Sequence, residues 1–447
     1  MKFDYRRGVF IAAAFCASLA LTACNNDTGS SELPGESDEH DHDHDHGGID
    51  SAGRLIITHA DGTNSRVHVY DLEDEAIVGS YALTYPASSI YASPEHRYAL
   101  LFQRDNDQIQ VLDSGLHLHD DHVHADDPAM LGFILSGIRP THYRVNDGQA
   151  AVFYDGNVDA GALAGFALLT DESLAAGGVV ASQSLSPAHH GIAEPLDGLV
   201  LASGVSGSDG RPDGIDIYEL HGDHFHGEGA LATACPGLHG GASNESFSVF
   251  GCTDGVLVAE LHGDHFHEAK LDMSERVASV LGHHGLDHFA AFASPSTNLY
   301  EIDPSVDSVS EVDWRGGAES SPGQPVNAVR YALDSHGEHP LILDDANTLH
   351  VLETSDWRVA ARLALPLGEN TNTAPALAFS GASHHAFVTD AANQSIHRID
   401  LETLTLDSET IALDFAPEGL AWTGIAGAAD DHDGHGHGHG HGHDHDQ

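Results

Sequence analysis

The sequence predicts an all-β protein, and within that class a β-propeller of eight blades, with seven blades as the alternative. Three observations lead to this prediction. Short apolar strands alternate with turns through the middle of the chain, no long amphipathic helix interrupts them, and one strand pattern recurs. The pattern returns about every 40–50 residues, which is the period of a four-stranded propeller blade.

The clearest copy of the repeat runs from Ser88 to Asp113 and contains an inner strand, a second strand and a third strand. Its second-strand element recurs at residues 150–154, 198–202, 247–251, 288–292, 340–343 and 385–388. Residues 54–58 form a second strand with no inner strand before it, and residues 418–422 form an inner strand with nothing after it. The two ends can therefore complete one blade and close the ring, which leaves few free strand edges.

The N-terminus carries an export signal. Basic residues at positions 2, 6 and 7 precede a short apolar stretch that ends in the sequence LTAC at residues 21–24. This ending resembles a lipobox, so we expect residues 1–23 to be a lipoprotein-type signal peptide and Cys24 to carry a lipid anchor. An ordinary signal peptide, cleaved nearby, is the alternative. Either signal predicts a periplasmic protein, and the lipobox predicts that it is tethered to a membrane.

Residues 24–52 and 426–447 are polar and rich in histidine, a composition typical of disordered tails. The propeller is therefore expected over residues 53–425. Within it, Cys235 and Cys252 are the cysteines that remain after export, and an oxidising compartment favours a disulfide between them. Two free thiols that bind zinc are the alternative, although the pair does not have C-x-x-C spacing.

The charge of the chain excludes some partners and favours others. With 17 basic and 69 acidic side chains, its formal net charge is −52. Such a surface repels nucleic acids and anionic lipid headgroups, and it attracts cations. The chain also holds 37 histidines but only 3 methionines, so its composition favours a metal-binding protein and argues against a thioether site for Cu(I).

A histidine hexapeptide of the form H-x-D-H-x-H occurs three times, each time after a third strand, and the last two copies share the sequence LHGDHFH. We therefore expect the three copies in outer loops on one face of the ring. Residues two apart in an extended segment point the same way, and imidazole and carboxylate groups suit zinc. Solvated polar hairpins are the alternative. The predicted ligands are His119, Asp121, His122, His124, His221, Asp223, His224, His226, His262, Asp264, His265 and His267.

A second set of histidines is predicted at the starts of inner strands. Because inner strands line the centre of a propeller, histidines from successive blades would converge on one face without being close in sequence. Histidines that hold blades together through hydrogen bonds are the alternative. The predicted ligands of this set are His142, His189, His190, His239, His283 and His284.

The tails form the third set. His40, His42, His44 and His46 alternate with aspartates, and the C-terminal tail alternates histidine with glycine or aspartate. Flexible histidine-rich segments bind Zn²⁺, Ni²⁺ and Cu²⁺ with little selectivity, because loose geometry leaves affinity to the intrinsic preferences of the metals. These segments predict metal capture or buffering, and a solvated tail without a role is the alternative.

Catalytic motifs do not stand out in the sequence. There is neither a G-x-S-x-G nucleophile elbow nor a nucleotide-binding glycine loop. We therefore expect a binding protein rather than an enzyme. A metal-dependent propeller hydrolase is the less favoured alternative, since a catalytic zinc needs an open coordination position beside a general base.

Taken together, these motifs resemble the AztD family of periplasmic zinc chaperones. The resemblance rests on the HGDHFH loops, the acidic and histidine-rich N-terminal tail, and the segments at residues 139–142, 189–191, 235–240 and 250–257. It implies a propeller that binds Zn²⁺ and passes it to the solute-binding protein of a zinc ABC importer, with residues 40–46 assisting. The lipobox and the long Gly-His tail depart from the family pattern.

The resemblance leaves a second interpretation open, in which this is a surface-anchored binding propeller whose metal sites are structural. In either case we expect a monomer that does not bind nucleic acid.

Overall fold

The computed structural model describes residues 51–427, apart from residue 63, residues 120–121, residue 209, residue 264 and residues 370–372. The predicted signal peptide with Cys24, the tail histidines His40, His42, His44 and His46, and the Gly-His tail all lie outside the described residues. Asp121 and Asp264 of the hexapeptides also lie outside them, as do the side chains of His119 and His122. The predicted segment boundaries stay predictions.

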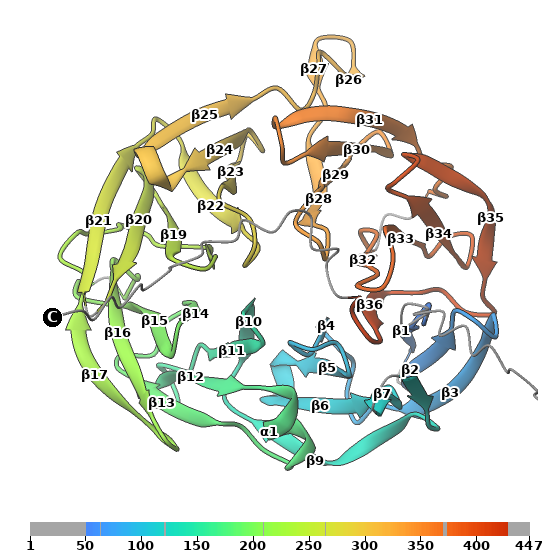
Figure 1. Cartoon of the computed structure of the whole chain (residues 1–447), viewed down its shortest axis with the longest axis horizontal. Coiled ribbons are helices and arrows are strands. Elements are labelled where there is room, and N and C mark those ends of the chain that lie inside the picture. The colour runs from blue at the N-terminus through green and yellow to red at the C-terminus, as the bar shows by residue number, and fades with distance from the viewer. Residues whose placement is uncertain are drawn as a thin grey trace, which may run out of the picture. The chain divides into compact units, whose positions relative to one another are not determined.

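Within the described residues, the strands form eight four-stranded antiparallel sheets arranged as the blades of a ring (Figure 1). The prediction of an all-β propeller with eight blades is thus confirmed. The ring closes in blade 1, where β36 (Gly419–Thr423) pairs with β1 (Arg54–Asp61), followed by β2 (Asn64–Asp71) and β3 (Ala76–Ala82). In this closure Leu55 lies opposite Trp422, so the two ends of the propeller share one sheet, as the sequence predicts.

The other blades follow in chain order. Blade 2 contains β4 (Ser89–Ala92), β5 (Tyr98–Gln103), β6 (Gln108–Asp113) and β9 (Ala129–Ser136), and blade 3 contains β10 (Pro140–Asn146), β11 (Gln149–Tyr154), β12 (Ala164–Leu169) and β13 (Ala181–Leu185). Blade 4 contains β14 (Ala193–Leu196), β15 (Leu199–Gly204), β16 (Gly214–His221) and β17 (His224–Ala230). Blade 5 contains β18 (Gly241–Ser243), β19 (Phe247–Cys252), β20 (Gly255–His262) and β21 (His265–Asp272).

Three blades complete the ring. Blade 6 contains β22 (Arg276–Leu281), β23 (Phe289–Ser294), β24 (Leu299–Asp303) and β25 (Ser308–Val312). Blade 7 contains β28 (Ala328–Leu333), β29 (Pro340–Asp344), β30 (Thr348–Glu353) and β31 (Arg358–Ala364). Blade 8 contains β32 (Leu377–Phe379), β33 (His385–Asp390), β34 (Ser395–Asp400) and β35 (Thr405–Ala412).

Several short elements lie in the connections between blade strands. Two hairpins lie outside the blades, β7 (Leu116–His119) with β8 (His122–Ala125), and β26 (Glu319–Ser321) with β27 (Gln324–Pro325). The helical elements are α1 (Asp171–Ala175), η1 (Arg104–Asn106) and η2 (Pro304–Val306). No helix in the described part of the chain is long and apolar enough to cross a membrane.

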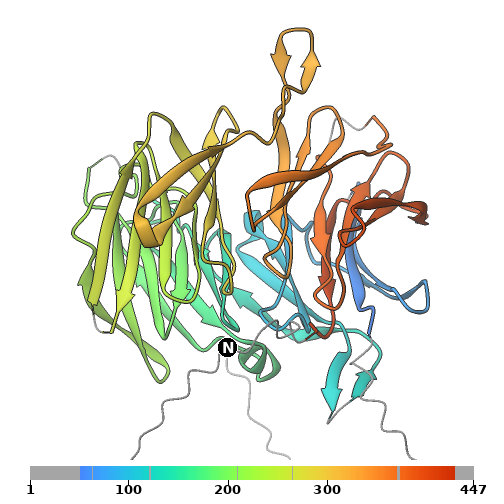
Figure 2. The same cartoon turned by 45° about the horizontal axis from the view of Figure 1, so that its top comes forward.

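The antiparallel strands give the ring two distinct faces. We call the face where inner strands begin the top face, and the face where they end the bottom face. Because strand direction alternates, the turn between the third and fourth strands of a blade lies on the bottom face. Figure 2 shows the β26–β27 hairpin (light orange) projecting from one face and the β7–β8 hairpin (teal) from the other.

The core lies between neighbouring blades. Second strands are buried over most of their length because both faces of each are covered, and all six residues of β5 are buried. Outer strands alternate instead, as β31 does with one side toward solvent. Phe102 of blade 2 packs with Val152 of blade 3, and Phe153 packs with Val200 of blade 4. Burying one such side chain stabilises the fold by about 1.5–3 kcal/mol.

Cys235 and Cys252 form a disulfide in blade 5, which confirms the predicted pairing. The bond joins the segment before β18 to the last residue of β19. It therefore restrains the loop that leads into the inner strand of this blade.

Candidate metal centre

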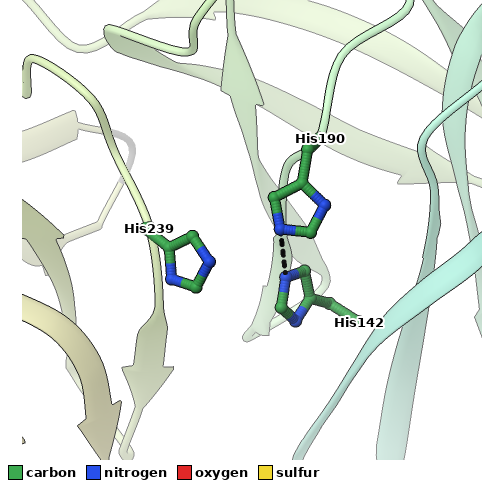
Figure 3. A group of neighbouring side chains, drawn as sticks. All are labelled: His142, His190 and His239. Carbon is green, nitrogen blue, oxygen red and sulfur yellow. Dashed lines mark hydrogen bonds between the residues drawn. The ribbon is translucent and has the colours of Figure 1, made fainter.

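Three of the predicted histidines meet on the top face (Figure 3). His142 lies near the start of β10, His190 lies just before β14, and His239 lies just before β18. They come from three successive blades, and their ligand atoms all lie within 4.8 Å of one another. Among the described residues, no other set of three or more His, Cys, Asp or Glu side chains meets this distance criterion. We call these residues the histidine triad.

The three rings face a common point through their Nε2 atoms. Nε2 of His142 lies 3.1 Å from Nε2 of His190, and the ring of His239 is centred 5.3 Å from that of His190. The Nδ1 atom of His239 contacts the backbone carbonyl of Ala278 at 2.7 Å, so this nitrogen must donate. The Nε2 atom of His239 is then the unprotonated one, and it is available to a metal ion.

Asp155 orients His190 in the same way. Its two carboxylate oxygens lie 3.1 and 3.2 Å from Nδ1 of His190, and its Oδ2 accepts a hydrogen bond from Arg104 at 2.7 Å. Burial alone would raise the pKa of Asp155, but hydrogen bonds from His190, Arg104 and Thr141 hold it below its usual value. Asp155 therefore stays ionised and keeps the proton of His190 on Nδ1. A carboxylate behind a metal-binding histidine is a common outer support of zinc sites.

Burial favours the neutral form of two of the three rings. Burial, followed by the nearby positive charge of Arg144, lowers the pKa of His142 to about 2. Burial also lowers the pKa of His239. Metal ions bind only unprotonated imidazole, so these side chains are prepared as ligands at neutral pH. Arg144 itself lies 3.0 Å from the buried Glu194, and burial raises the pKa of Glu194 to about 7.

Glycines beside the histidines set the backbone path of the site. Gly240 follows His239 with a φ of +79°, and a Cβ there would come within 2.7 Å of the Ala278 carbonyl that orients His239. Gly191 follows His190, and a Cβ there would overlap the hydroxyl of Ser203. These close approaches explain why glycine follows the histidines in the two motifs.

His189 points away from the triad. Its ring is buried, with Nδ1 2.9 Å from the carbonyl of Pro187 and Nε2 2.9 Å from the carbonyl of Ser203. These contacts attach the loop before β14 to β15 of the same blade, so this ring does not connect two blades.

A cavity of about 310 Å³ lies beside the triad on the top face. His190 and His239 form one side of it, and its other lining residues are Gly210, Arg211, Pro212, Gly237, Leu238, Thr253 and Arg276. The triad is therefore reached from this cavity. Three imidazoles leave one of the four positions of a tetrahedral zinc ion for a ligand that comes from there.

The second and third hexapeptides lie at the tips of the β16–β17 and β20–β21 hairpins, on the bottom face. In the second copy, the rings of His221 and His226 are centred 4.6 Å apart, and Nε2 of His224 lies 3.2 Å from Nε2 of His226. In the third copy, the rings of His262 and His267 are centred 4.5 Å apart. Each tip thus gathers three histidine rings on one side of its hairpin.

Glutamates complete these hairpin tips. Glu219 pairs with His226 across the ladder and lies 2.9 Å from Nε2 of His221, and Glu260 lies 2.9 Å from Nε2 of His262. Asp223 instead contacts Nδ1 of His224 at 3.3 Å. Sequence reasoning missed both glutamates, although the alternation of the third strand places each on the same side as the histidine two residues later.

The first hexapeptide lies in the β7–β8 hairpin, which is inserted between the third and fourth strands of blade 2. The backbone of His119 pairs with that of His122, and the ring of His124 stacks on the ring of His117 at 5.5 Å. All three copies thus follow a third strand and lie on the bottom face, opposite to the triad.

The placement of His283 and His284 at the start of an inner strand is wrong. They follow β22, the inner strand of blade 6, and lie on the bottom face, where Nδ1 of His284 is 3.3 Å from Oδ1 of Asn146. The His-His-Gly sequence resembles that of blade 4, but the apolar residues that form the inner strand precede it here instead of following it. These two histidines therefore cannot join the triad.

Comparison with known proteins places this geometry in context. No family model matches the chain. The chain is 30% identical over 206 residues to the zinc chaperone AztD of Citrobacter koseri, an alignment that covers 44% of this chain and 46% of that protein. The chain thus spans about half the length of the curated relative that it matches. Crystal structures of Citrobacter koseri AztD, including the apo form, superpose with a TM-score of 0.69.

These superpositions cover 85% of this chain and 99% of the AztD chain at 20% sequence identity. The resemblance to the AztD family is confirmed. Like AztD, the chain folds as a propeller, and the aligned structures extend over nearly the whole of the AztD chain. The identity of the histidine ligands rests on the geometry above rather than on this similarity.

Proposed function

We propose that this AztD-like protein is a zinc chaperone that holds Zn²⁺ at His142, His190 and His239. The observation that carries the proposal is the convergence of three imidazoles from three blades, two of them oriented by outer hydrogen bonds. Imidazole nitrogen is a preferred zinc ligand, and three protein ligands leave the fourth position to an exchangeable group.

We further propose that the held ion passes to the solute-binding protein of a zinc ABC importer. Transfer between proteins needs a ligand of the acceptor to reach the metal before the donor releases it. The His190 side chain is 45% exposed and borders the top-face cavity, so an incoming ligand can reach the fourth position. A structural zinc, by contrast, is enclosed by four protein ligands.

In this proposal the hexapeptides and the tails collect Zn²⁺ at the surface of the protein. The net charge of −52 gathers cations near the surface, and the exposed hairpin tips offer imidazoles and carboxylates to them. The tail histidines, His40 to His46 among them, add further weak sites. Export and tethering through Cys24 would place this collection in the periplasm, where an importer takes its zinc.

Metal transfer is favoured over catalysis at this site. A catalytic zinc works beside a general base that takes a proton from the bound water. Asp155 is the carboxylate at the triad, and Arg104 and His190 already occupy its oxygens. It is placed to hold a ligand in position rather than to accept a proton from water.

The test of this function is a transfer experiment with the cognate solute-binding protein. Zinc-loaded full-length protein is mixed with the metal-free partner, the two are separated, and the zinc in each is counted. We expect wild type and a His288→Ala control to transfer about one more ion per chain than the triple variant H142A/H190A/H239A. Equal transfer by the triple variant would show that the triad does not carry the transferred ion.

A further inference from the structure

The top-face cavity beside the triad differs in charge from the chain as a whole. Arg211 and Arg276 line it, and no described residue of its lining is acidic. Both arginines are exposed to solvent. The whole chain has 69 acidic and only 17 basic side chains, so a cavity lined in this way runs against its composition. The approach to the triad is therefore a positively charged opening in an acidic protein.

A second cavity, of about 520 Å³, has the opposite charge. It lies between the hairpins of blades 4 and 5 that carry two of the hexapeptides, and no described residue of its lining is a lysine or an arginine. Cations are thus favoured in this cavity, whereas an anion is favoured beside the triad. The acidic lining residues of the second cavity are Asp197, Glu219, Glu228 and Glu268.

Hydrogen bonds hold the neighbouring carboxylates of the top-face cavity elsewhere. Asp213 lies two residues after the first arginine, and its oxygens accept hydrogen bonds from the N–H and the hydroxyl of Ser206, at 2.8 and 2.6 Å. Glu275 precedes the second arginine, and its Oε2 accepts hydrogen bonds from Tyr300 at 2.6 Å and from Asn298 at 3.0 Å. Both carboxylates are therefore held by other donors and do not line the cavity.

The backbone joins one of the arginines to the triad. The loop between β15 and β16 carries Arg211, and the loop before β18 carries His239. The N–H of Leu238 donates to the carbonyl of Pro212 at 3.0 Å, and a second backbone hydrogen bond joins Cys235 to the same loop at 2.9 Å. These bonds connect the loop that brings the positive charge to the loop that brings a metal ligand, so the two belong to one site.

A carboxylate is the anion that fits both the arginines and the triad. The planar guanidinium group of arginine matches a carboxylate through parallel hydrogen bonds. Carboxylate oxygen is also an ordinary zinc ligand. Imidazole ligands bring no charge, so the positive charge of a held Zn²⁺ favours an anion in its open position.

We propose that the top-face cavity is the docking site for a carboxylate side chain, Asp or Glu, of the protein that receives the zinc. Arg211 and Arg276 bind this carboxylate first. One of its oxygens then takes the open position on the ion, and the exchangeable group that occupied this position leaves. The inference rests on the proposed function and adds to it the chemistry of the acceptor, which presents an acidic side chain to this cavity.

The rate of zinc transfer tests the docking site. Zinc-loaded full-length protein is mixed with the metal-free cognate solute-binding protein, and the zinc in the acceptor is followed with time. The variant R211Q/R276Q removes both charges without adding a carboxylate, and R66Q/R358Q removes the same charge from exposed arginines outside the cavity. We expect R211Q/R276Q to retain as much zinc as wild type before mixing and to transfer it about 10-fold more slowly, with R66Q/R358Q at the wild-type rate.

The outcomes of this experiment separate the docking site from the function on which it rests. Equal rates for R211Q/R276Q and R66Q/R358Q, with normal transfer by wild type, overturn the docking site alone. A wild-type protein that transfers no zinc overturns the proposed function, and the inference falls with it.

Acetate, a free carboxylate, gives a second test that needs no partner. The protein is loaded with Co²⁺, whose visible spectrum changes when an anion enters its coordination sphere, and the spectrum of equally loaded H142A/H190A/H239A is subtracted to remove the contribution of the tails. We expect acetate to bind R211Q/R276Q at least about 10-fold more weakly than R66Q/R358Q. Equal acetate affinity of the two variants contradicts the proposal. Acetate binding that needs both arginines, combined with an unchanged rate of zinc transfer, would assign the cavity to a free carboxylate and overturn the docking of the acceptor.

Discussion

Nε2 of His142 and Nε2 of His190 lie 3.1 Å apart, although the two residues belong to different blades. Because Asp155 keeps the proton of His190 on Nδ1, His142 must donate in this contact. A metal ion that enters between them needs the lone pair of both nitrogens. Binding therefore requires the proton of His142 to move from Nε2 to Nδ1, a change of tautomer without a change of charge.

Asp155 is expected to raise the zinc affinity of the triad without touching the ion. The substitution Asp155→Asn removes the negative charge behind His190 and loosens its tautomer. Changes to such outer supports lower metal affinity by about 10- to 100-fold. Competition with a chromophoric chelator measures the affinity of the tightest site. Asp159 is an exposed aspartate in the same blade, so the control variant Asp159→Asn should leave that affinity unchanged. Equal zinc affinity of the two variants would show that Asp155 does not support the site.

Zn²⁺ at the triad should stay bound at an acidic pH at which histidines with an ordinary pKa release their metal. An ordinary histidine is protonated below a pKa of about 6.5, whereas burial lowers the pKa of His142 to about 2 and that of His239 below its usual value. Wild type should therefore keep about one more Zn²⁺ than H142A/H190A/H239A at both pH 7.5 and pH 5.5. The measurement is bound zinc per chain after dialysis, and loss of this difference at pH 5.5 would contradict neutral ligands.

The same lowered pKa values set the pH dependence of the metal-free fold. Below pH 6.5 the histidines of the unfolded chain become protonated, whereas His142 and the buried His68 of the folded chain stay neutral, because desolvation lowers the pKa of His142 to about 2 and that of His68 to about 4. The free energy of unfolding therefore falls as the pH drops from 6.5 toward 4. Urea unfolding of the apoprotein at pH 7, 6 and 5 measures this loss. His68→Gln should flatten the dependence relative to His288→Gln, and parallel curves would refute the assignment.

Much of the fold could be predicted from sequence because blades repeat. The recurrence of second strands gave the number of blades, and the unmatched strands at residues 54–58 and 418–422 gave the closure of the ring. His142, His190 and His239 were each expected at the start of an inner strand. Which of six such histidines share one ion could not be predicted, because the distance between them depends on how three blades pack.

The failures have identifiable physical causes. His283 and His284 were misplaced because a His-His-Gly sequence can either precede or follow an inner strand, and only the ladder of β22 decides between them. Asp155 lies at the end of a second strand and shows its role only when Arg104 of the neighbouring blade approaches.

The disulfide should stabilise both the fold and the metal site. Closing a loop across a separation of 17 residues contributes about 3 kcal/mol by restricting the unfolded chain. Because this loop carries His239, the variant C235S/C252S should unfold at lower urea concentration and bind zinc at the triad more weakly. Urea unfolding and chelator competition measure the two effects. Reduced wild type should match the variant, and a variant with unchanged zinc affinity would show that the loop is held by its other contacts alone.

Gly240 offers a sharper test of how His239 is oriented. In Gly240→Ala the new Cβ would lie 2.7 Å from the Ala278 carbonyl, the acceptor that fixes the ring of His239. We expect this carbonyl to shift and the triad to lose zinc affinity by at least the 10-fold that loss of an outer support costs. Gly222→Ala is the matched control, because its φ is also positive at +67° but its Cβ would meet nothing within 4 Å. Both variants could lose stability equally while neither loses zinc affinity. In that case backbone strain alone explains why residue 240 is glycine, and the Ala278 carbonyl does not orient His239.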